Sequence, residues 1–169
     1  MLTNTITFKL PLKLADMPDA SRVWVYKADR VLNAEEVNSI LQDGQTFSDG
    51  WRSHGEGLSA AVDILLDRFV VIMVDDQVVD VGGCSIDTSL HFIKMIEQKI
   101  NVLLTDRMIV WYEHDGEIQK CRTAPFREKA CNGHVNGDTI VYNDLVNNKA
   151  DLQTNFRVAA KDSWLSNFL

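Results

Sequence analysis

Residues 58–81 read LSAAVDILLDRFVVIMVDDQVVDV, and this stretch decides the fold. Apolar residues alternate with small or polar ones along 58–66, run almost without a break along 69–74, and return at 78–81. Each segment has the length and composition of a β-strand, and short polar breaks separate the three. Because such short connections can only join antiparallel neighbours, the stretch predicts a three-stranded antiparallel meander over 58–81.

A helix is expected directly after the meander. Apolar residues recur there every three or four positions, as Ile86, Leu90, Ile93, Ile96 and Ile100. This spacing predicts a helix at about 86–100. Ser85 or Asp87 is suited to cap its start, because either side chain can accept a hydrogen bond from a free backbone amide.

A second helix is expected before the meander. Asn33 followed three residues later by Glu36 is the capping-box pattern of a helix start. An apolar stripe at helical spacing follows these two residues, and Gly44 is predicted to end the helix.

The remaining predicted elements are short. They are a strand at 22–27, a hairpin of 108–113 and 117–122 around Asp115-Gly116, a helix at 125–130, a strand at 139–142 and a helical turn at 149–155. Together with the meander they predict an α+β fold, with one domain, a mainly antiparallel sheet and flanking short helices.

The N-terminal residues have a pattern of their own. Apolar residues alternate from Ile6 to Leu14, which predicts a strand, and Pro11 confines such a strand to the edge of a sheet. Residues 1–21 are therefore interpreted as an N-terminal extension or an edge strand. Residues 22–169 are interpreted as the single α+β domain.

Charge and cysteine content narrow the class of protein. The 169-residue chain carries 17 Lys and Arg against 24 Asp and Glu, so its formal net charge is −7. A protein that coats nucleic acid needs a basic surface, which this composition does not favour. Three cysteines without C-x-x-C spacing indicate a reducing cytoplasm, and neither a membrane span nor a secretory signal is recognisable.

The first candidate site lies at the start of the helix predicted at 86–100. Two glycines, Gly82 and Gly83, precede it, and free amides at a helix start favour an anion or a thiolate. The candidate anion- or ligand-binding residues here are Gly83, Cys84, Ser85 and Asp87. Cys84 is also a candidate nucleophile. The alternative interpretation is a plain turn with capping residues and a small, inert cysteine.

The second candidate site is the glycine-rich turn at residues 51–57. His54 is a candidate general base and Arg52 a candidate anion-binding residue. If the fold brings His54 to Cys84, the two form a thiol–imidazole pair. The alternative is a surface turn with a solvated His54.

Acidic residues offer a third, weaker hypothesis. Asp63 lies on a strand of the predicted meander, Asp87 near the start of the following helix, and Asp106 after the next predicted strand. Carboxylates in this order suit a two-metal nuclease with a ribonuclease H-like fold. Most aspartates between 63 and 87 lie at predicted turns, where their side chains bond the backbone, so no metal site is predicted.

Motifs of the commonest cofactor sites do not occur in the chain. It contains neither G-x-x-x-x-G-K-[ST] nor G-x-G-x-x-G, so neither a P-loop nor a Rossmann nucleotide site is supported. His91, His114 and His134 are not spaced as a metal-binding pair. We therefore expect no cofactor.

An ordered series of short motifs runs through the chain. It comprises Arg22-Val23-Trp24-Val25-Tyr26, Trp51 with His54-Gly55, Gly83-Cys84-Ser85-Ile86-Asp87, Asp106-Arg107-Met108, residues 138–143, residues 149–152 and Asp162-Ser163-Trp164. In this order the motifs resemble a family of small, uncharacterised bacterial proteins that often carry the label "ABC transporter ATPase". The resemblance covers residues 22–169, with Leu165 in place of an expected histidine and Gly82 in place of a serine or threonine.

The resemblance implies a bacterial protein but transfers no functional residue. Its label implies ATP hydrolysis, for which this chain lacks the phosphate-binding loop. Our first hypothesis is a non-catalytic binding or interaction protein, with a protein or a small anion as ligand, because aromatic residues lie near predicted turns at Trp24, Trp51 and Trp164. The alternatives are the thiol enzyme of Cys84 and His54, and the metal-dependent nuclease.

Overall fold

The computed structural model describes residues 7–169, which form an α+β fold whose strand pairs are all antiparallel. The helices are α1 (Leu12–Ala15), α2 (Ala34–Gly50), α3 (Gly83–Ile100), α4 (Thr123–Cys131) and α5 (Lys149–Asn155). The strands are β1 (Arg22–Lys27), β2 (Arg52–Ser53), β3 (Glu56–Gly57), β4 (Ser59–Leu65), β5 (Phe69–Asp75), β6 (Ile109–His114), β7 (Glu117–Arg122), β8 (Ile140–Tyr142) and β9 (Arg157–Ala159). Two 3₁₀ turns, η1 (Ala160–Asp162) and η2 (Trp164–Phe168), end the chain. The predicted α+β class is thus confirmed.

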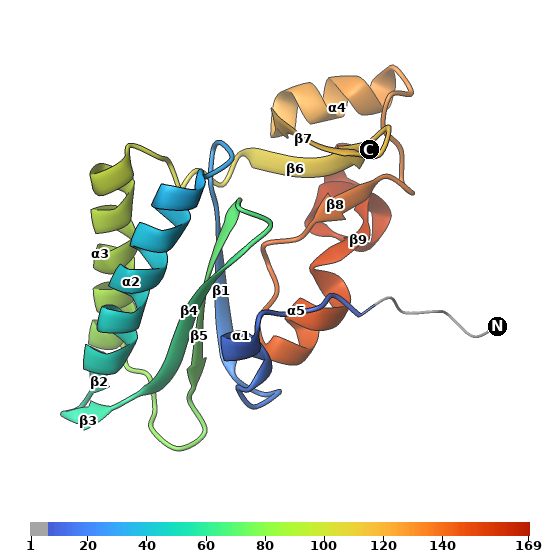
Figure 1. Cartoon of the computed structure of the whole chain (residues 1–169). Coiled ribbons are helices and arrows are strands. Elements are labelled where there is room, and N and C mark those ends of the chain that lie inside the picture. The colour runs from blue at the N-terminus through green and yellow to red at the C-terminus, as the bar shows by residue number, and fades with distance from the viewer. Residues whose placement is uncertain (1–6) are drawn as a thin grey trace.

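Two sheets are stacked in the middle of the molecule (Figure 1). The first has the strand order β1-β5-β4, the second has the order β7-β6-β8-β9, and β2 and β3 form a small separate hairpin. Helices α2 and α3 cover one face of the first sheet, and the C-terminal half of the chain lies against the other face. Helix α4 and the two 3₁₀ turns pack on the far side of the second sheet.

The central strand β5 explains the uninterrupted apolar run in the sequence. Val70 and Ile72 point into the core beneath α2 and α3, and Phe69 and Val71 point into the core shared with the C-terminal half. All four side chains are fully buried. Because side chains alternate between the faces of a strand, burial of both faces requires an apolar residue at every position.

The third strand of the predicted meander is wrong. Residues 78–81 form no strand, and Val78 is 84% exposed. The second edge of β5 is taken by β1, with Trp24 opposite Ile72. Strand β1 pairs with β5 over all six of its residues, which is more than the four-residue segment 78–81 could pair. The chain after β5 therefore leaves the sheet and continues into α3.

Helix α2 begins as predicted and ends later. The Asn33 side chain accepts a hydrogen bond from the Glu36 amide at 2.9 Å, and the Glu36 carboxylate accepts one from the Asn33 amide at 3.0 Å, which is the predicted capping box. Gly44 does not end the helix, which continues to Gly50. A Cβ on Gly44 would lie 2.8 Å from the Cβ of Val62, so this glycine lets α2 approach β4 closely.

Helix α3 confirms the helix predicted at about 86–100 and begins slightly earlier, at Gly83. Gly82 occupies the N-cap position and provides no side-chain cap. The prediction that Ser85 or Asp87 caps this helix is therefore wrong. Ser85 is buried and its hydroxyl donates to the Arg52 carbonyl oxygen instead.

The C-terminal elements lie where their patterns predicted them. Asp115 and Gly116 have φ angles of +52° and +79°, the left-handed backbone that a tight hairpin turn between β6 and β7 requires. Helix α4 spans the predicted 125–130, and α5 coincides with the predicted 149–155.

The N-terminal strand prediction is wrong for the described residues, and Ile6 lies outside them. Residues 7–11 pair with no strand, and Pro11 precedes the helical turn α1. Leu10 and Leu14, four positions apart, are buried on one side of this segment. The buried Lys149 ammonium donates to the carbonyl oxygens of Ala15 and Met17, each at 2.5 Å, and so ties α1 to α5.

Over residues 7–169, no helix combines the length and the apolar character needed to cross a bilayer.

Candidate functional site

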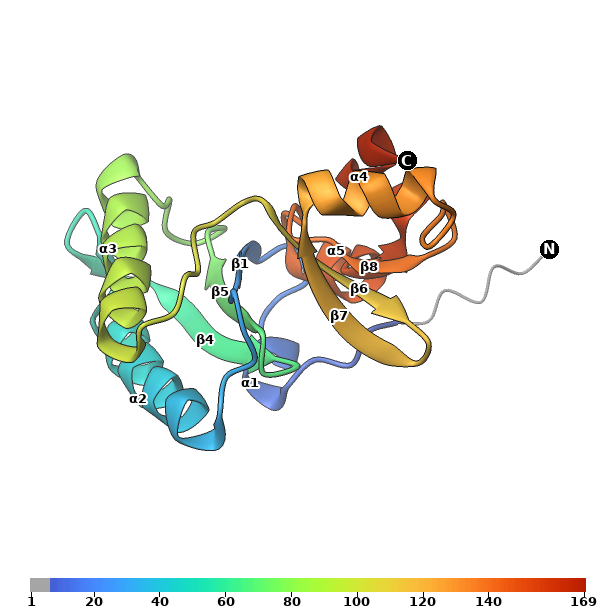
Figure 2. The ribbon, with the colours of Figure 1, turned by 90° about the horizontal axis from the view of Figure 1, so that it is seen from above.

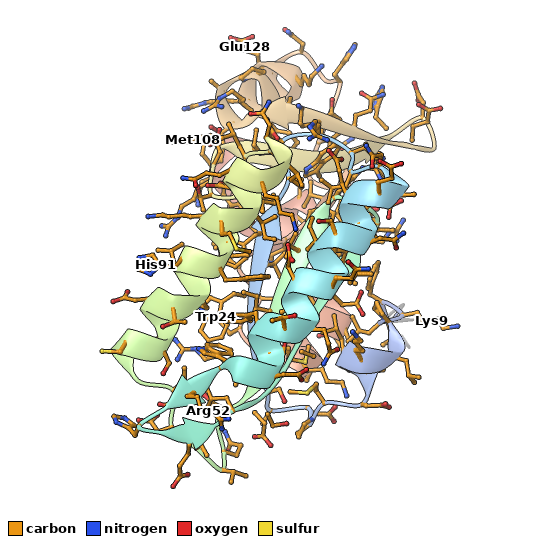
Figure 3. All side chains as sticks on the ribbon, turned by 60° about the vertical axis from the view of Figure 1, so that its left-hand side comes forward. Lys9, Trp24, Arg52, His91, Met108 and Glu128 are labelled. Carbon is orange, nitrogen blue, oxygen red and sulfur yellow. The ribbon has the colours of Figure 1, made fainter. Side chains whose placement is uncertain are left out.

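The two glycine-rich motifs of the sequence meet in space. The β2–β3 hairpin lies against the start of α3, and Figure 3 labels Arg52 on this hairpin. The Ser85 hydroxyl donates to the Arg52 carbonyl oxygen at 2.8 Å, and the Trp51 indole N–H donates to the Ser85 carbonyl oxygen at 2.9 Å. Ser53 of β2 ties the hairpin to the segment before α3, because its hydroxyl donates to the Asp80 carbonyl oxygen at 2.6 Å.

The candidate thiol and imidazole lie on the surface of this junction. His54 is exposed at the hairpin tip with a φ of +51°, and a Cβ on Gly82 would lie 3.3 Å from its Nε2 atom. Cys84 is exposed on the first turn of α3. The fold therefore brings His54 beside Gly82, two residues before Cys84, and leaves both side chains exposed to solvent.

The other candidate residues where the hairpin meets α3 differ in burial, since one is buried and hydrogen-bonded and the others are exposed. Ser85 uses its hydroxyl within the fold, whereas Gly83, Arg52 and Asp87 are exposed. The backbone amides of Ser85 and Ile86 both donate to the Gly82 carbonyl oxygen at 3.1 Å. The two motifs thus have a clear structural role, which is to fasten the hairpin to α3.

The three aspartates of the nuclease hypothesis lie on separate elements. The Asp63 carboxylate on β4 accepts a hydrogen bond from the Ile64 amide at 2.8 Å. Asp106, before β6, pairs with Arg122 at 2.6 Å, and Asp87 is exposed on α3. Within residues 7–169 no three His, Cys, Asp or Glu side chains are grouped so as to hold a metal ion.

A large hollow of the described chain lies along β1. It is a groove of about 1080 Å³, lined by residues 22–27 of β1, by 104–107, by 144–147, by Trp164 and by one face of α3. The α3 residues in this lining are Ile86, Leu90 and Lys94. In Figure 2, β1 lies between α3 on one side and the C-terminal half of the chain on the other, and residues from both sides line the groove. We call this hollow the β1 groove.

A buried ion pair lies at the bottom of the β1 groove. The Lys27 ammonium is 3.1 Å from Oδ2 of Asp144, and the two side chains are only 3% and 12% exposed. The Trp164 indole N–H donates to Oδ1 of the same aspartate at 3.1 Å, and the Lys27 ammonium lies 5.2 Å from the Trp164 ring centroid. Lysine, aspartate and tryptophan thus hold each other in fixed positions.

Burial shifts the pKa of Lys27 and that of the neighbouring Tyr26. Desolvation lowers the pKa of Lys27 below its ordinary value, and the attraction of Asp144 and then of Asp106 offsets part of that effect. Desolvation raises the pKa of Tyr26, against the opposing charge of Arg107.

The cations at the rim of the β1 groove are not matched by the carboxylates there. Asp106 is engaged by Arg122, and Asp144 by Lys27. Across residues 7–169 no carboxylate lies within 4.0 Å of the charged groups of Arg22, Lys94 or Arg107. The groove therefore has an excess of positive charge in a protein whose net charge is −7.

The β1 groove was not predicted from the sequence, although its strand was. One local signal was present. Val23, Val25 and Lys27 alternate on one face of β1, and a lysine that continues an apolar face is a sign of a buried, paired charge. Its partner Asp144 is far away in the sequence and has no such signal.

Comparison with known proteins adds no assignment to this geometry. No family model matches the chain, and no significant match is found among curated proteins or among solved structures.

Proposed function

We propose that this chain is a non-catalytic binding protein and that its ligand occupies the β1 groove. The observation that carries the proposal is the character of the groove itself. It is large, it combines apolar and aromatic walls with a few charged groups, and concave sites of this kind are where proteins bind ligands.

The arrangement of the charges supports binding rather than catalysis. Lys27, the buried lysine of the groove, is held by Asp144, which is itself held by Trp164. A general base must have a free lone pair within reach of the proton that it abstracts. The Lys27 ammonium instead donates to its neighbours, so it shapes and charges the groove.

The Cys84 and His54 enzyme is the second candidate function, and one observation favours it. The hairpin places His54 beside Gly82, two residues before Cys84. Both side chains are exposed and lie outside the β1 groove, so this candidate has the smaller structural support.

The wider classification belongs to the same proposal. The ordered motifs between residues 22 and 169 support membership of the small bacterial family described above, without the ATPase activity in its label. Three free cysteines, Cys84, Cys121 and Cys131, support a cytoplasmic location.

The proposal can be tested by amide correlation spectra of the isotope-labelled full chain. The probes are inorganic phosphate, citrate, adenosine monophosphate and an octapeptide of alternating glutamate and valine. We expect at least one probe to shift amides of residues 22–27 and 144–147 in a saturable manner. Shifts confined to residues 52–57 and 83–87 would overturn the proposal in favour of the thiol site. The absence of shifts with all four probes would also contradict it.

A further inference from the structure

We propose that the β1 groove binds an acidic peptide segment in extended conformation, which joins the first sheet as a fourth strand beside β1. The inference rests on the proposed function, because it names the ligand class of the same groove. Three features carry it: an open sheet edge, an excess of cations, and an apolar wall on the opposite side.

The first feature is the open edge of β1. In the strand order β1-β5-β4 one edge of β1 faces away from β5. On that side the Val23 amide donates to the Asn147 carbonyl oxygen at 3.1 Å, and the Asp29 amide donates to the Leu103 carbonyl oxygen at 3.0 Å. These two hydrogen bonds close the ends of the edge.

The part of the β1 edge between these two hydrogen bonds, residues 25–27, remains open, and we call it the backbone window. Backbone amides alternate in direction along a strand, so the amides of Val25 and Lys27 point to the same side as those of Val23 and Asp29. In residues 7–169 neither amide has a backbone acceptor on that side. Both residues line the β1 groove. An unpaired strand edge is a template for another chain, and here it lies inside a groove.

The second feature is charge. The Trp24 and Tyr26 side chains point toward α3, and Arg22 shares their face, with its guanidinium 4.7 Å from the Trp24 ring centroid. Lys94 joins them from α3, and Arg107 is close enough to Tyr26 to affect its pKa. The unpaired cations are therefore gathered on the α3 side of the open edge, where the carboxylates of an added strand would meet them.

The third feature is the other wall of the groove. It is formed by Val146, Trp164 and Leu145, and Leu145 is an apolar side chain left 59% exposed. Because side chains of a strand alternate between the two faces, one peptide can satisfy both walls. The ligand that fits is an extended segment with acidic residues on one face and apolar residues on the other.

A nucleic acid strand would also bring negative charge to this groove. It would leave the peptide groups of Val25 and Lys27 without the complementary donors and acceptors that a β-strand supplies. The open backbone window therefore favours a peptide, and an oligonucleotide becomes a competing outcome of the test.

The test uses the octapeptide of alternating glutamate and valine and two N-methylated versions of it. One version carries N-methyl groups on every glutamate and the other on every valine. In a strand all residues of one face direct their amides to the same side, so only one version blocks the bonds to β1. We expect that version to bind at least about tenfold more weakly than the other, measured by titration of the full chain.

The identity of the sensitive version gives the strand direction. In antiparallel pairing the residues that bond to Val25 and Lys27 share their face, so methylation of the valines would weaken binding. In parallel pairing the methylated glutamates would do so. Equal binding of the two versions, whether tight or weak, would overturn strand addition.

Variants and a second probe complete the test. Lys94→Glu should weaken binding of the unmodified peptide about threefold at low salt, and Arg127→Glu on α4, outside the groove, should leave it unchanged. Equal effects of the two variants would contradict the charge argument. Tighter binding of oligothymidylate than of the peptide would overturn the peptide in favour of nucleic acid.

The test separates the two levels of the proposal. If peptide or phosphate shifts the amides of residues 22–27 but N-methylation has no selective effect, strand addition fails and the binding groove stands. If none of the probes reaches these amides, the proposed function itself fails.

Discussion

The Lys27 ammonium and the Asp144 carboxylate lie 3.1 Å apart at the bottom of the β1 groove, 117 positions apart in the sequence. The pair joins β1 to the segment between β8 and α5 and so fixes two walls of the groove relative to each other. Removal of one partner from a buried ion pair leaves an uncompensated charge, which costs more than the net contribution of the pair.

Lys27→Met should therefore lower the free energy of unfolding by about 3 kcal/mol, and Asp144→Asn by a similar amount. The double variant should lose much less stability than the two single variants lose together, because it leaves no buried charge without a partner. Urea denaturation of the four proteins of this cycle measures the coupling. A coupling below about 0.5 kcal/mol would show that the two side chains act independently.

Gly44 gives a prediction on packing. Gly44→Ala should destabilise the protein by about 2 kcal/mol, because the new methyl group would lie 2.8 Å from the Cβ of Val62. Gly50→Ala is the matched control, since no atom lies within 4 Å of its added Cβ, and its effect should stay within about 0.5 kcal/mol. If both substitutions behave alike in thermal melts, the close approach of α2 to β4 is not what requires glycine.

Glu113 gives a prediction on pH. The Arg157 guanidinium, bonded to both of its carboxylate oxygens at 2.7 Å, holds the pKa of Glu113 below its ordinary 4.5. The pKa is lower in the folded than in the unfolded chain, so the contribution to stability is complete above 4.5. It is lost as the pH falls through 4.5 and then through the folded value.

Glu113→Gln should accordingly flatten the acid limb of the stability curve, followed by urea midpoints as the pH is lowered. Glu128→Gln, on the exposed face of α4, should retain the slope of the unmodified chain. An unchanged slope in Glu113→Gln would mean that the ion pair of Glu113 and Arg157 carries none of the acid dependence.

The three cysteines should differ in reactivity. Burial raises the pKa of the Cys121 thiol to about 11, whereas Cys84 and Cys131 are exposed. Because the thiolate is the reactive form, a disulfide reagent at about pH 8 should modify two thiols quickly and the third slowly. Cys121→Ser should remove only the slow phase, and urea should make all three alike. A fast Cys121 in the folded chain would contradict its burial.

Variants of His54 and Cys84, where the β2–β3 hairpin meets the start of α3, separate the two candidate functions. His54→Ala and Cys84→Ser alter exposed side chains outside the β1 groove, so we expect the peptide titration to remain within about twofold of the unmodified chain. Loss of binding in either variant, with the melting temperature unchanged, would move the site from the groove to the hairpin and the start of α3.

Local patterns of sequence determined most of the secondary structure of this protein. The uninterrupted apolar run 69–74 identified the central strand, Asn33 and Glu36 the start of α2, and Asp115-Gly116 the hairpin turn. Each of these patterns acts between residues at most four positions apart, through strand alternation, a capping hydrogen bond or a required backbone angle. Such signals are complete within a short window and can be read directly.

The tertiary structure alone decided which segments meet. It assigned the second edge of β5 to β1 rather than to 78–81, made Gly44 a packing position instead of a helix end, and brought Asp144 to Lys27. Each depends on the competition between distant segments for the same strand edge or the same buried volume. That competition is resolved by the packing of the whole chain and not by its local pattern. The β1 groove is a product of this packing, because its walls come from five separate parts of the sequence.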